Sequence, residues 1–301
     1  MTNNKKTELI DRIEVELKDN FPATEQENLI RLTRLYFQDS LTEDMINEPI
    51  ENLFGTILCL WDFIQHKTSD VPKIRVYNPN YEEHSWHSTH TVIEILSNDM
   101  PFLVSSFNMA LVRLGLTIHL TSHPVLQVNR NEKGELQHVQ AFSNSGTNEA
   151  LIRFEIDRIS DLSKFDEIKI EIQNTLIDVK KTVNDWSKMQ QNLLNIIEES
   201  TQVAHLKDDE EHHENLDFLR WVANNHFTFI GFRAYDLVQK GKDTHLKLVD
   251  GSGLGTFRDN DSTQVKRDIV LSDRLAKLAI DNRNALVLTK STAVSSVHRP
   301  V

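Results

Sequence analysis

Apolar positions are densest between residues 88 and 128, where their spacing predicts a strand, a helix and a second strand. Residues 91–96 are β-branched or apolar apart from Glu94, as in a buried strand. Residues 116–121 alternate apolar and polar side chains, which predicts a half-buried strand that continues to residue 128. Between them a helix over 101–114 is predicted by apolar residues three or four positions apart, namely Leu103, Phe107, Ala110, Leu111 and Leu114.

The polar segment before this helix has the composition of a helix start. Asp99 is predicted as the N-cap, and Pro101 fits the first turn, where a missing N–H costs nothing. Gly115 lies where a left-handed residue is expected to end the helix. The unit therefore turns sharply on both sides of its helix.

The flanking segments extend the pattern to an α+β fold. Helices are predicted throughout residues 1–66, and a long helix of roughly 50 Å over 163–199, kinked near Asn184-Asp185 or bridging two domains. Further strands are predicted at 73–77, 136–142 and 151–159, with a hairpin turn at 129–134. This order predicts an antiparallel sheet with helices on one face.

The second half repeats the pattern incompletely. A helix is predicted beyond the polar segment 205–213, then a hairpin from 227–238 and 245–249, a helix at 271–280 and a strand at 285–290. The expected division is a helical segment over 1–72, a first α+β domain over 73–200 and a second over 201–301. The abrupt end after His298-Arg299-Pro300 suggests that the second domain is truncated.

Composition narrows the class of protein. The formal net charge of −12 argues against nucleic acid or an anionic membrane as the main partner. Residues 1–19 lack a signal-peptide core, and no apolar run reaches the ~20 residues of a membrane span. Cys59 is the single cysteine, so no internal disulfide can form, and a cytoplasmic location is expected. Cys59 is interpreted as a small core residue rather than a nucleophile.

Other groups of polar residues have simpler structural explanations. His84, His87 and His90 invite a zinc interpretation, but a spacing of three does not converge on one face, and a polar loop around Trp86 is favoured. Arg153, Glu155 and Asp157 alternate along the clearest strand and are interpreted as its solvated face. The pair His212-His213 is interpreted in the same way.

The glycines at 251–255 suggest a dinucleotide-binding loop only weakly. That fingerprint needs a helix directly after it, whereas the segment that follows here has a loop-like composition. A turn or a close backbone approach is the preferred explanation of these glycines. No cofactor or metal site is therefore expected within this chain.

Four segments in order resemble the N-terminal region of the large bacterial NAD-dependent glutamate dehydrogenases. They are VYNPNYEEHSWHSTHTVIEILSNDMPFLVSSFNMALVRLGLTIHLTSHPV, HFTFIGFRAYDL, GSGLGTFRD and LTKSTAVSSVHRP. The resemblance covers most of the chain from about Ile74 to Val301. It implies two ACT-like regulatory domains, the second partial, within a longer enzyme whose NAD and catalytic domain lie elsewhere.

The resemblance also implies a location for an effector. Asn98-Asp99-Met100-Pro101 fits the ACT turn that leads from strand to helix, although Phe102 stands where the family usually has glycine. The expected amino-acid effector site is the helix start, whose free N–H groups attract a carboxylate. Its tentative residues are Asn98, Asp99, Met100, Leu103 and His119.

Three functions remain open from the sequence. The first is a regulatory and oligomerisation region of a glutamate dehydrogenase, which would associate with itself and with the catalytic domain. The second is a purely structural assembly module without a ligand, in which Asp99 only caps the helix. The third is an independent enzyme or metal protein that uses the histidines at 84, 87 and 90.

Overall fold

The computed structural model describes residues 2–68, 70–202, 209–258 and 267–280, together with 286, 288 and 294–298. The chain forms two compact units, Met1–Asn174 and Thr175–Val301. The boundary falls inside helix α7 (Ser163–Thr201), a single helix that continues past Asn184-Asp185 and contributes to both units. The three-part division expected from the sequence stays a prediction.

The N-terminal segment is helical, as predicted. Its first two long helices are separated by Asn20-Phe21-Pro22, and Pro49 directly precedes the last helix, where proline's fixed φ is tolerated. The short helix α3 lies within the span predicted as helical but was not predicted as a separate helix, because six residues are too few to show a periodic stripe. The four helices are α1 (Thr2–Asn20), α2 (Ala23–Gln38), α3 (Thr42–Asn47) and α4 (Ile50–Ile64).

The first unit is organised around an antiparallel sheet in the order β1-β2-β6-β4-β5, with β3 also paired to β6. The strand predicted over 116–128 is broken at His123-Pro124, because proline cannot donate to the ladder, and both resulting strands pair with β6. Two helices interrupt the strand order. The elements are β1 (Lys73–Tyr77), α5 (Tyr81–His84), β2 (Thr91–Asn98), α6 (Leu103–Arg113), β3 (Ile118–Ser122), β4 (Val125–Arg130), β5 (Leu136–Ala141) and β6 (Thr147–Ile156).

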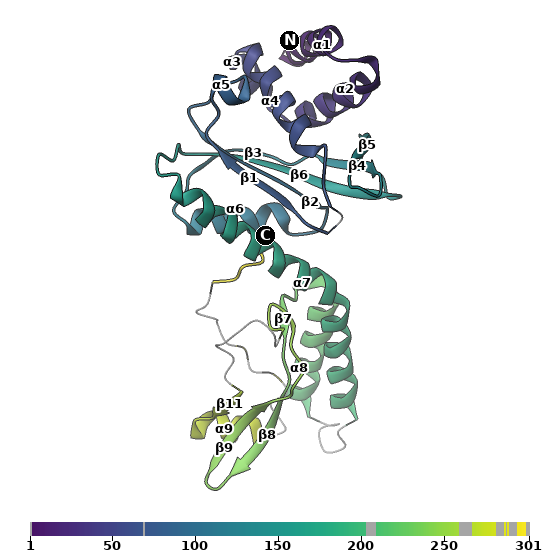
Figure 1. Ribbon diagram of the computed structural model, residues 1–301. Coiled ribbons are helices and arrows are strands. Elements are labelled where there is room, and N and C mark those ends of the chain that lie inside the picture. The colour runs from purple at the N-terminus through teal and green to yellow at the C-terminus, as the bar shows by residue number, and fades with distance from the viewer. Residues whose placement is uncertain are drawn as a thin grey trace. The chain divides into compact units, whose positions relative to one another are not determined.

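Helices cover both faces of this sheet, not one as the sequence suggested. Figure 1 shows α6 and the start of α7 on one face and α1, α2 and α4 on the other. On the face covered by α1, α2 and α4, the sheet residues Leu96 and Leu151 belong to one hydrophobic core with helix residues such as Leu32 and Leu60. A sheet buried on both faces explains why β2 and β6 contain almost no exposed residues.

The second unit is a smaller α+β arrangement. Helix α8 (Glu210–Trp221) begins at Asp209, whose side chain accepts a hydrogen bond from the backbone N–H of His212, and it ends in a short π-helical turn, η2 (Val222–His226). The predicted hairpin is present and turns at Gly241. The strands are β7 (Gly231–Phe232), β8 (Tyr235–Lys240), β9 (Asp243–Leu248), β10 (Leu254–Gly255) and β11 (Asp268–Val270), and helix α9 is Asp273–Ile280. The predicted strand over 285–290 lies outside the described residues apart from Leu286 and Leu288.

The glycine-rich segment of this unit makes a close backbone contact rather than a nucleotide-binding turn. Gly255 lies in β10 with φ +60°, and a Cβ there would be 2.4 Å from the carbonyl oxygen of Ile230. Asp185 on α7 accepts from the Gly255 N–H at 2.8 Å and from two nitrogens of Arg258, each at 2.6 Å. These contacts confirm the structural explanation of the glycines at this position.

The α+β class is confirmed, and two side-chain predictions are wrong. His212 is buried, not solvated, and its Nε2 lies 3.1 Å from the carbonyl oxygen of Ser200. Arg153 is also buried, for the reason given below. Within the described part of the chain, no helix has the length and apolar character needed to cross a membrane.

Candidate functional site

The predicted effector turn has a different geometry from the one expected. Helix α6 begins at Leu103, and Phe102 is at its N-cap in the left-handed conformation, with φ +74°. Asp99 therefore does not cap the helix, because the left-handed residue and Pro101 separate it from the first turn. Phe102 has the backbone conformation that favours glycine, which matches its position in the ACT-type turn.

The residues expected at this turn fall into different environments. Asn98 accepts a hydrogen bond from Lys67 Nζ at 2.8 Å, and Leu103 is buried in the hydrophobic interior. Met100 is half-buried, whereas Asp99 is exposed. Desolvation raises the pKa of Asp99, although the imidazole of His123 and the Met100 N–H oppose this shift. Of the four residues predicted at this turn, Asn98 and Leu103 are therefore engaged within the fold, whereas Asp99 and Met100 are left as ligand candidates.

His119 is not part of this group. It lies on β3 beside Ile118, which pairs with Ile156, whereas Asn98 pairs with Glu149 at the other end of β6. Six or seven residues along a strand correspond to about 20 Å. The structure therefore brings Asn98, Asp99, Met100 and Leu103 together and places His119 elsewhere.

The three histidines at 84, 87 and 90 do not converge either. His84 stacks on Tyr77 with ring centroids 4.6 Å apart, and His87 stacks on Tyr81. His90 lies against His119, 4.5 Å between ring centroids. No group of three or more potential metal ligands occurs among the residues that the structure describes.

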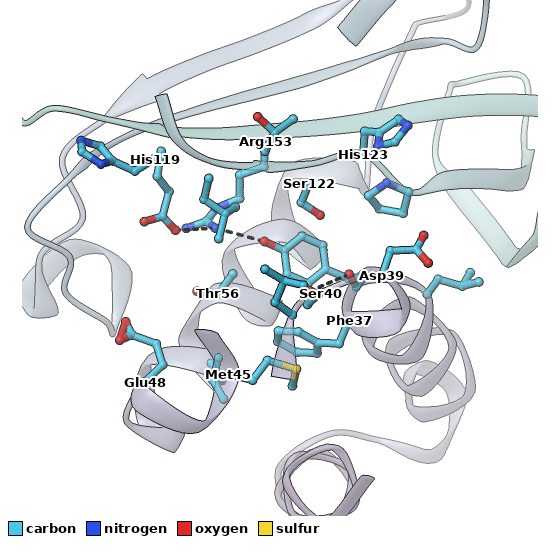
Figure 2. A pocket seen from close by; sticks show the side chains of 18 of the residues that line it. Phe37, Asp39, Ser40, Met45, Glu48, Thr56, His119, Ser122, His123 and Arg153 are labelled. Carbon is cyan, nitrogen blue, oxygen red and sulfur yellow. Dashed lines mark hydrogen bonds and ion pairs between the residues drawn. The ribbon is translucent and has the colours of Figure 1, made fainter. Parts of the chain in front are cut away.

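A cavity of about 280 Å³ opens instead between the helical layer and the sheet of the first unit. Its helical wall comes from the end of α2, from α3 and from α4, and its sheet wall from β3 and β6 (Figure 2). Apolar side chains such as Phe37, Met45 and Leu53 form part of the lining. His119 is in the sheet wall, and Glu48 is in the helical wall. This volume suits a small metabolite rather than a dinucleotide.

Arg153 extends from β6 into this space (Figure 2). It is 3% exposed, its Nη1 donates to the Tyr36 hydroxyl at 3.0 Å, and the same nitrogen lies 2.7 Å from Glu155 Oε1. The guanidinium also lies over the Trp86 ring, 5.3 Å from its centroid. Burial opposes the charged form, but neighbouring groups, Glu155 and Glu94 among them, outweigh this effect, so the pKa of Arg153 is raised.

A second buried charge lies next to Arg153 on the neighbouring strand. Glu94 is fully buried and accepts from Arg75 Nε at 2.8 Å, Arg75 Nη2 at 2.5 Å and the Tyr77 hydroxyl at 2.9 Å. Its Oε1 is 4.0 Å from Arg153 Nε, because Glu94 and Arg153 are directly opposite in the β2–β6 register. Burial together with Glu94 raises the pKa of Tyr77, which is therefore a neutral donor.

The strand face of Arg153, Glu155 and Asp157 was therefore misread as solvated. Only Asp157 is exposed, and its pKa is lowered by the hydrogen bond from His119, whose Nε2 is 2.6 Å from Oδ1. Glu155 also lies 3.3 Å from His90 Nδ1. The signal in the sequence was a charged residue that interrupts a mostly apolar strand, Arg153 in one strand and Glu94 in the other. Such a pattern fits a buried ion pair as well as a solvent-exposed face.

Cys59 lies on the same helical layer, close to Trp86. Its sulfur accepts a hydrogen bond from Trp86 Nε1 at 3.3 Å, and burial raises the pKa of the thiol. A raised pKa keeps the thiol protonated and unreactive. The interpretation of Cys59 as a core residue is confirmed.

Comparison with known proteins agrees with the resemblance seen in the sequence. Residues 32–172 match the family model described as "Glutamate dehydrogenase, ACT1 domain". The chain is 33% identical over 256 residues, or 83% of its length, to the NAD-specific glutamate dehydrogenase of Halomonas elongata. It is 31% identical over 86% of its length to the enzyme of the same name from Pseudomonas aeruginosa. The chain spans 16% of the length of each of these relatives.

Proposed function

Since the chain belongs to the NAD-specific glutamate dehydrogenase family and carries its ACT1 domain at residues 32–172, we propose that it is a regulatory and assembly region of such an enzyme. The family match is the observation that carries this proposal. The parent reaction would convert L-glutamate, NAD and water into 2-oxoglutarate, ammonia and NADH. In this proposal NAD binds to another part of the enzyme, which resides in the cytoplasm.

The regulatory part of the proposal is that the chain binds a free amino acid as an effector. The first unit contains a cavity of suitable size, about 280 Å³, lined by a buried cation. The turn at residues 98–103 stays the site expected from the resemblance to ACT domains. Asp99 and Met100 support it, whereas the side chain at position 102 stands where a ligand would approach the backbone.

The assembly part of the proposal is that the chain associates with itself and with the catalytic domain of the parent enzyme. Several apolar side chains of the first unit are exposed, for example Ile170, 56% exposed on α7, and Val112, 63% exposed on α6. Burying such side chains in a protein contact is favourable. An assembly role without any ligand is the second candidate function, and the same experiment separates the two.

Isothermal titration of the 301-residue chain with all twenty amino acids, NAD and 2-oxoglutarate tests the proposal, with sedimentation velocity on the same sample. The expected result is saturable binding of at least one amino acid, no binding of NAD, and a mass greater than that of one chain. Self-association without heat from any amino acid would support the assembly role alone. A monomer that binds none of these ligands would contradict both parts.

A further inference from the structure

We propose that the cavity between the helical layer and the sheet of the first unit binds a free amino acid with an apolar side chain, held as a zwitterion beside Arg153. This inference rests on the proposed regulatory function and assigns it a site. The site is distinct from the turn at residues 98–103, which the resemblance to ACT domains indicates. Its assignment follows from the hydrogen bonding, the charge balance and the lining of the cavity.

Arg153 retains donor capacity at the cavity. Its interactions with Tyr36 and Glu155 are both made by Nη1. Nε is buried and faces Glu94, whose Oε1 lies 4.0 Å away, whereas none of the interactions among the described residues involves Nη2. A guanidinium nitrogen without an acceptor favours a carboxylate ligand more than an arginine already saturated would. The first ligand group is therefore a carboxylate.

The charge balance selects a zwitterion over a simple anion. Two cations, the half-buried Arg75 and the buried Arg153, are already balanced by Glu94 and Glu155, so the cluster is neutral without a ligand. A ligand with only a carboxylate would add an uncompensated negative charge beside this partly buried cluster, which is costly. A ligand that also carries an ammonium group adds no net charge.

The mouth of the cavity supplies partners for the ammonium group. Asp39, just after α2, and Glu48, just after α3, both line the cavity and are both exposed. They belong to the helical wall, whereas Arg153 extends from the sheet wall (Figure 2). These acidic residues of the helical wall are the partners that this proposal assigns to the ammonium group.

The remaining lining indicates the side chain. Phe37, Met45 and Leu53 are each at most 6% exposed and provide an apolar surface in the helical wall. Contact with this wall removes an apolar ligand side chain from water, whereas a second carboxylate would meet no further buried cation of the lining. Leucine and methionine are accordingly the first ligands to test, with aspartate as the disfavoured comparison.

Titration of the full 301-residue chain with L-leucine, L-leucinamide and N-acetyl-L-leucine tests the two charged contacts separately. The amide lacks the carboxylate, and the acetyl derivative lacks the ammonium charge. We expect one L-leucine per chain, with at least tenfold weaker binding of both derivatives and of L-aspartate. Equal affinity for L-leucine and its N-acetyl derivative would overturn the zwitterion assignment.

Two variants locate the site. Ser122→Phe places a large ring in the sheet wall of the cavity, and Ser145→Phe makes the same change on an exposed loop outside it. We expect Ser122→Phe to lose L-leucine binding while Ser145→Phe keeps it, with unchanged far-UV circular dichroism in both. Arg153→Lys, which keeps the charge and removes the planar fork, is expected to weaken binding at least tenfold.

The outcomes separate the site from the function. If Ser122→Phe binds L-leucine like the unchanged chain, the cavity assignment is wrong although the regulatory function stands, and loss in Asp99→Ala would then place the effector at the turn. If no amino acid binds the unchanged chain, both the effector function and the cavity assignment are wrong. If Ser122→Phe is misfolded, unchanged affinity in a folded Arg153→Lys variant overturns the assignment.

Discussion

Neutralising the buried carboxylate of Glu94 should lower the free energy of unfolding of the first unit by a large amount for a single substitution. Glu94→Gln preserves the shape of the side chain but removes the charge that Arg75 and Tyr77 contact. The change leaves Glu155 as the ion-pair partner of Arg153, and the exposed Asp62, 3.9 Å from Arg75 Nη1, as that of Arg75. Breaking a buried ion pair by neutralising one partner destabilises proteins by about 3–5 kcal/mol.

The structure narrows this range. Glu94 is 0% exposed, which favours the full penalty, but the Arg75 side chain is 27% exposed and also donates to the Cys59 carbonyl oxygen at 2.9 Å. Water and this second acceptor soften the loss of the carboxylate. We therefore expect the free energy of unfolding of the first unit to fall by about 3 kcal/mol, at the lower end of the range.

Urea unfolding measures this change if the signal comes from the first unit alone. Replacing Trp186 and Trp221 by phenylalanine leaves Trp61 and Trp86 as reporters, both buried in the first unit. With a denaturant slope of about 2 kcal/mol per molar urea, the midpoint should fall by about 1.5 M.

Glu83→Gln is the matched control for this prediction. It makes the same chemical change on a side chain that is 74% exposed, and it should alter the free energy of unfolding by less than about 0.5 kcal/mol. If Glu94→Gln and Glu83→Gln gave equal losses, the carboxylate of Glu94 would not be part of a buried charge cluster. The charge balance used to choose the ligand of the cavity would then fail as well.

Three further predictions concern backbone conformation and pH. Phe102→Gly should be more stable than Phe102→Ala by about 1 kcal/mol in the same urea assay, the reverse of the order inside a helix, because φ is +74°; a more stable alanine variant would contradict the left-handed geometry. Gly255→Ala should lower the thermal midpoint of the second unit more than Gly251→Ala does, because only the first Cβ meets a backbone oxygen, at 2.4 Å; equal losses would show that this close approach is absent. The hydrogen bond from Arg258 lowers the pKa of Asp185, so the contribution of Asp185 to stability is present above the unfolded pKa of about 3.9 and is lost as pH falls through the folded pKa. Asp185→Asn should therefore reduce the dependence of the second unit's stability on pH below about pH 4. An unchanged pH dependence would refute the assignment.

Periodicity was sufficient for most of the fold. The helical character of residues 1–66 was predicted, and Gly115 has the left-handed conformation expected after α6. These features are local, since a helix stripe and a glycine turn are decided by residues within a few positions. The apolar stripe of a helix does not identify the surface on which the helix packs. The sequence pattern therefore did not reveal that the N-terminal helices pack on the second face of the sheet.

That missing partner explains the error at Arg153. An apolar strand with alternating charges looks half-solvated when only one face of its sheet is assumed to be covered. Once α2 and α4 cover the other face, the same alternation requires Arg153 to find buried acceptors, and it finds Tyr36 on α2 and Glu155 on its own strand. The pairing of Glu94 with Arg153 depends on the β2–β6 register, which joins segments far apart in sequence.

The same tertiary arrangement divides the predicted effector site in two. His119, chosen for its supposed closeness to the helix start, lines the cavity, whereas Asp99 and Met100 stay at the turn about 20 Å away. His123 lies between them, because it lines the same cavity wall and its imidazole acts on the pKa of Asp99. Independent responses to mutation are therefore expected only of positions as far apart as His119 and Asp99. His119→Ala and Asp99→Ala should affect effector binding one at a time. If each abolished binding of the same ligand in a folded chain, the two positions would be coupled, with His123 in the wall between them.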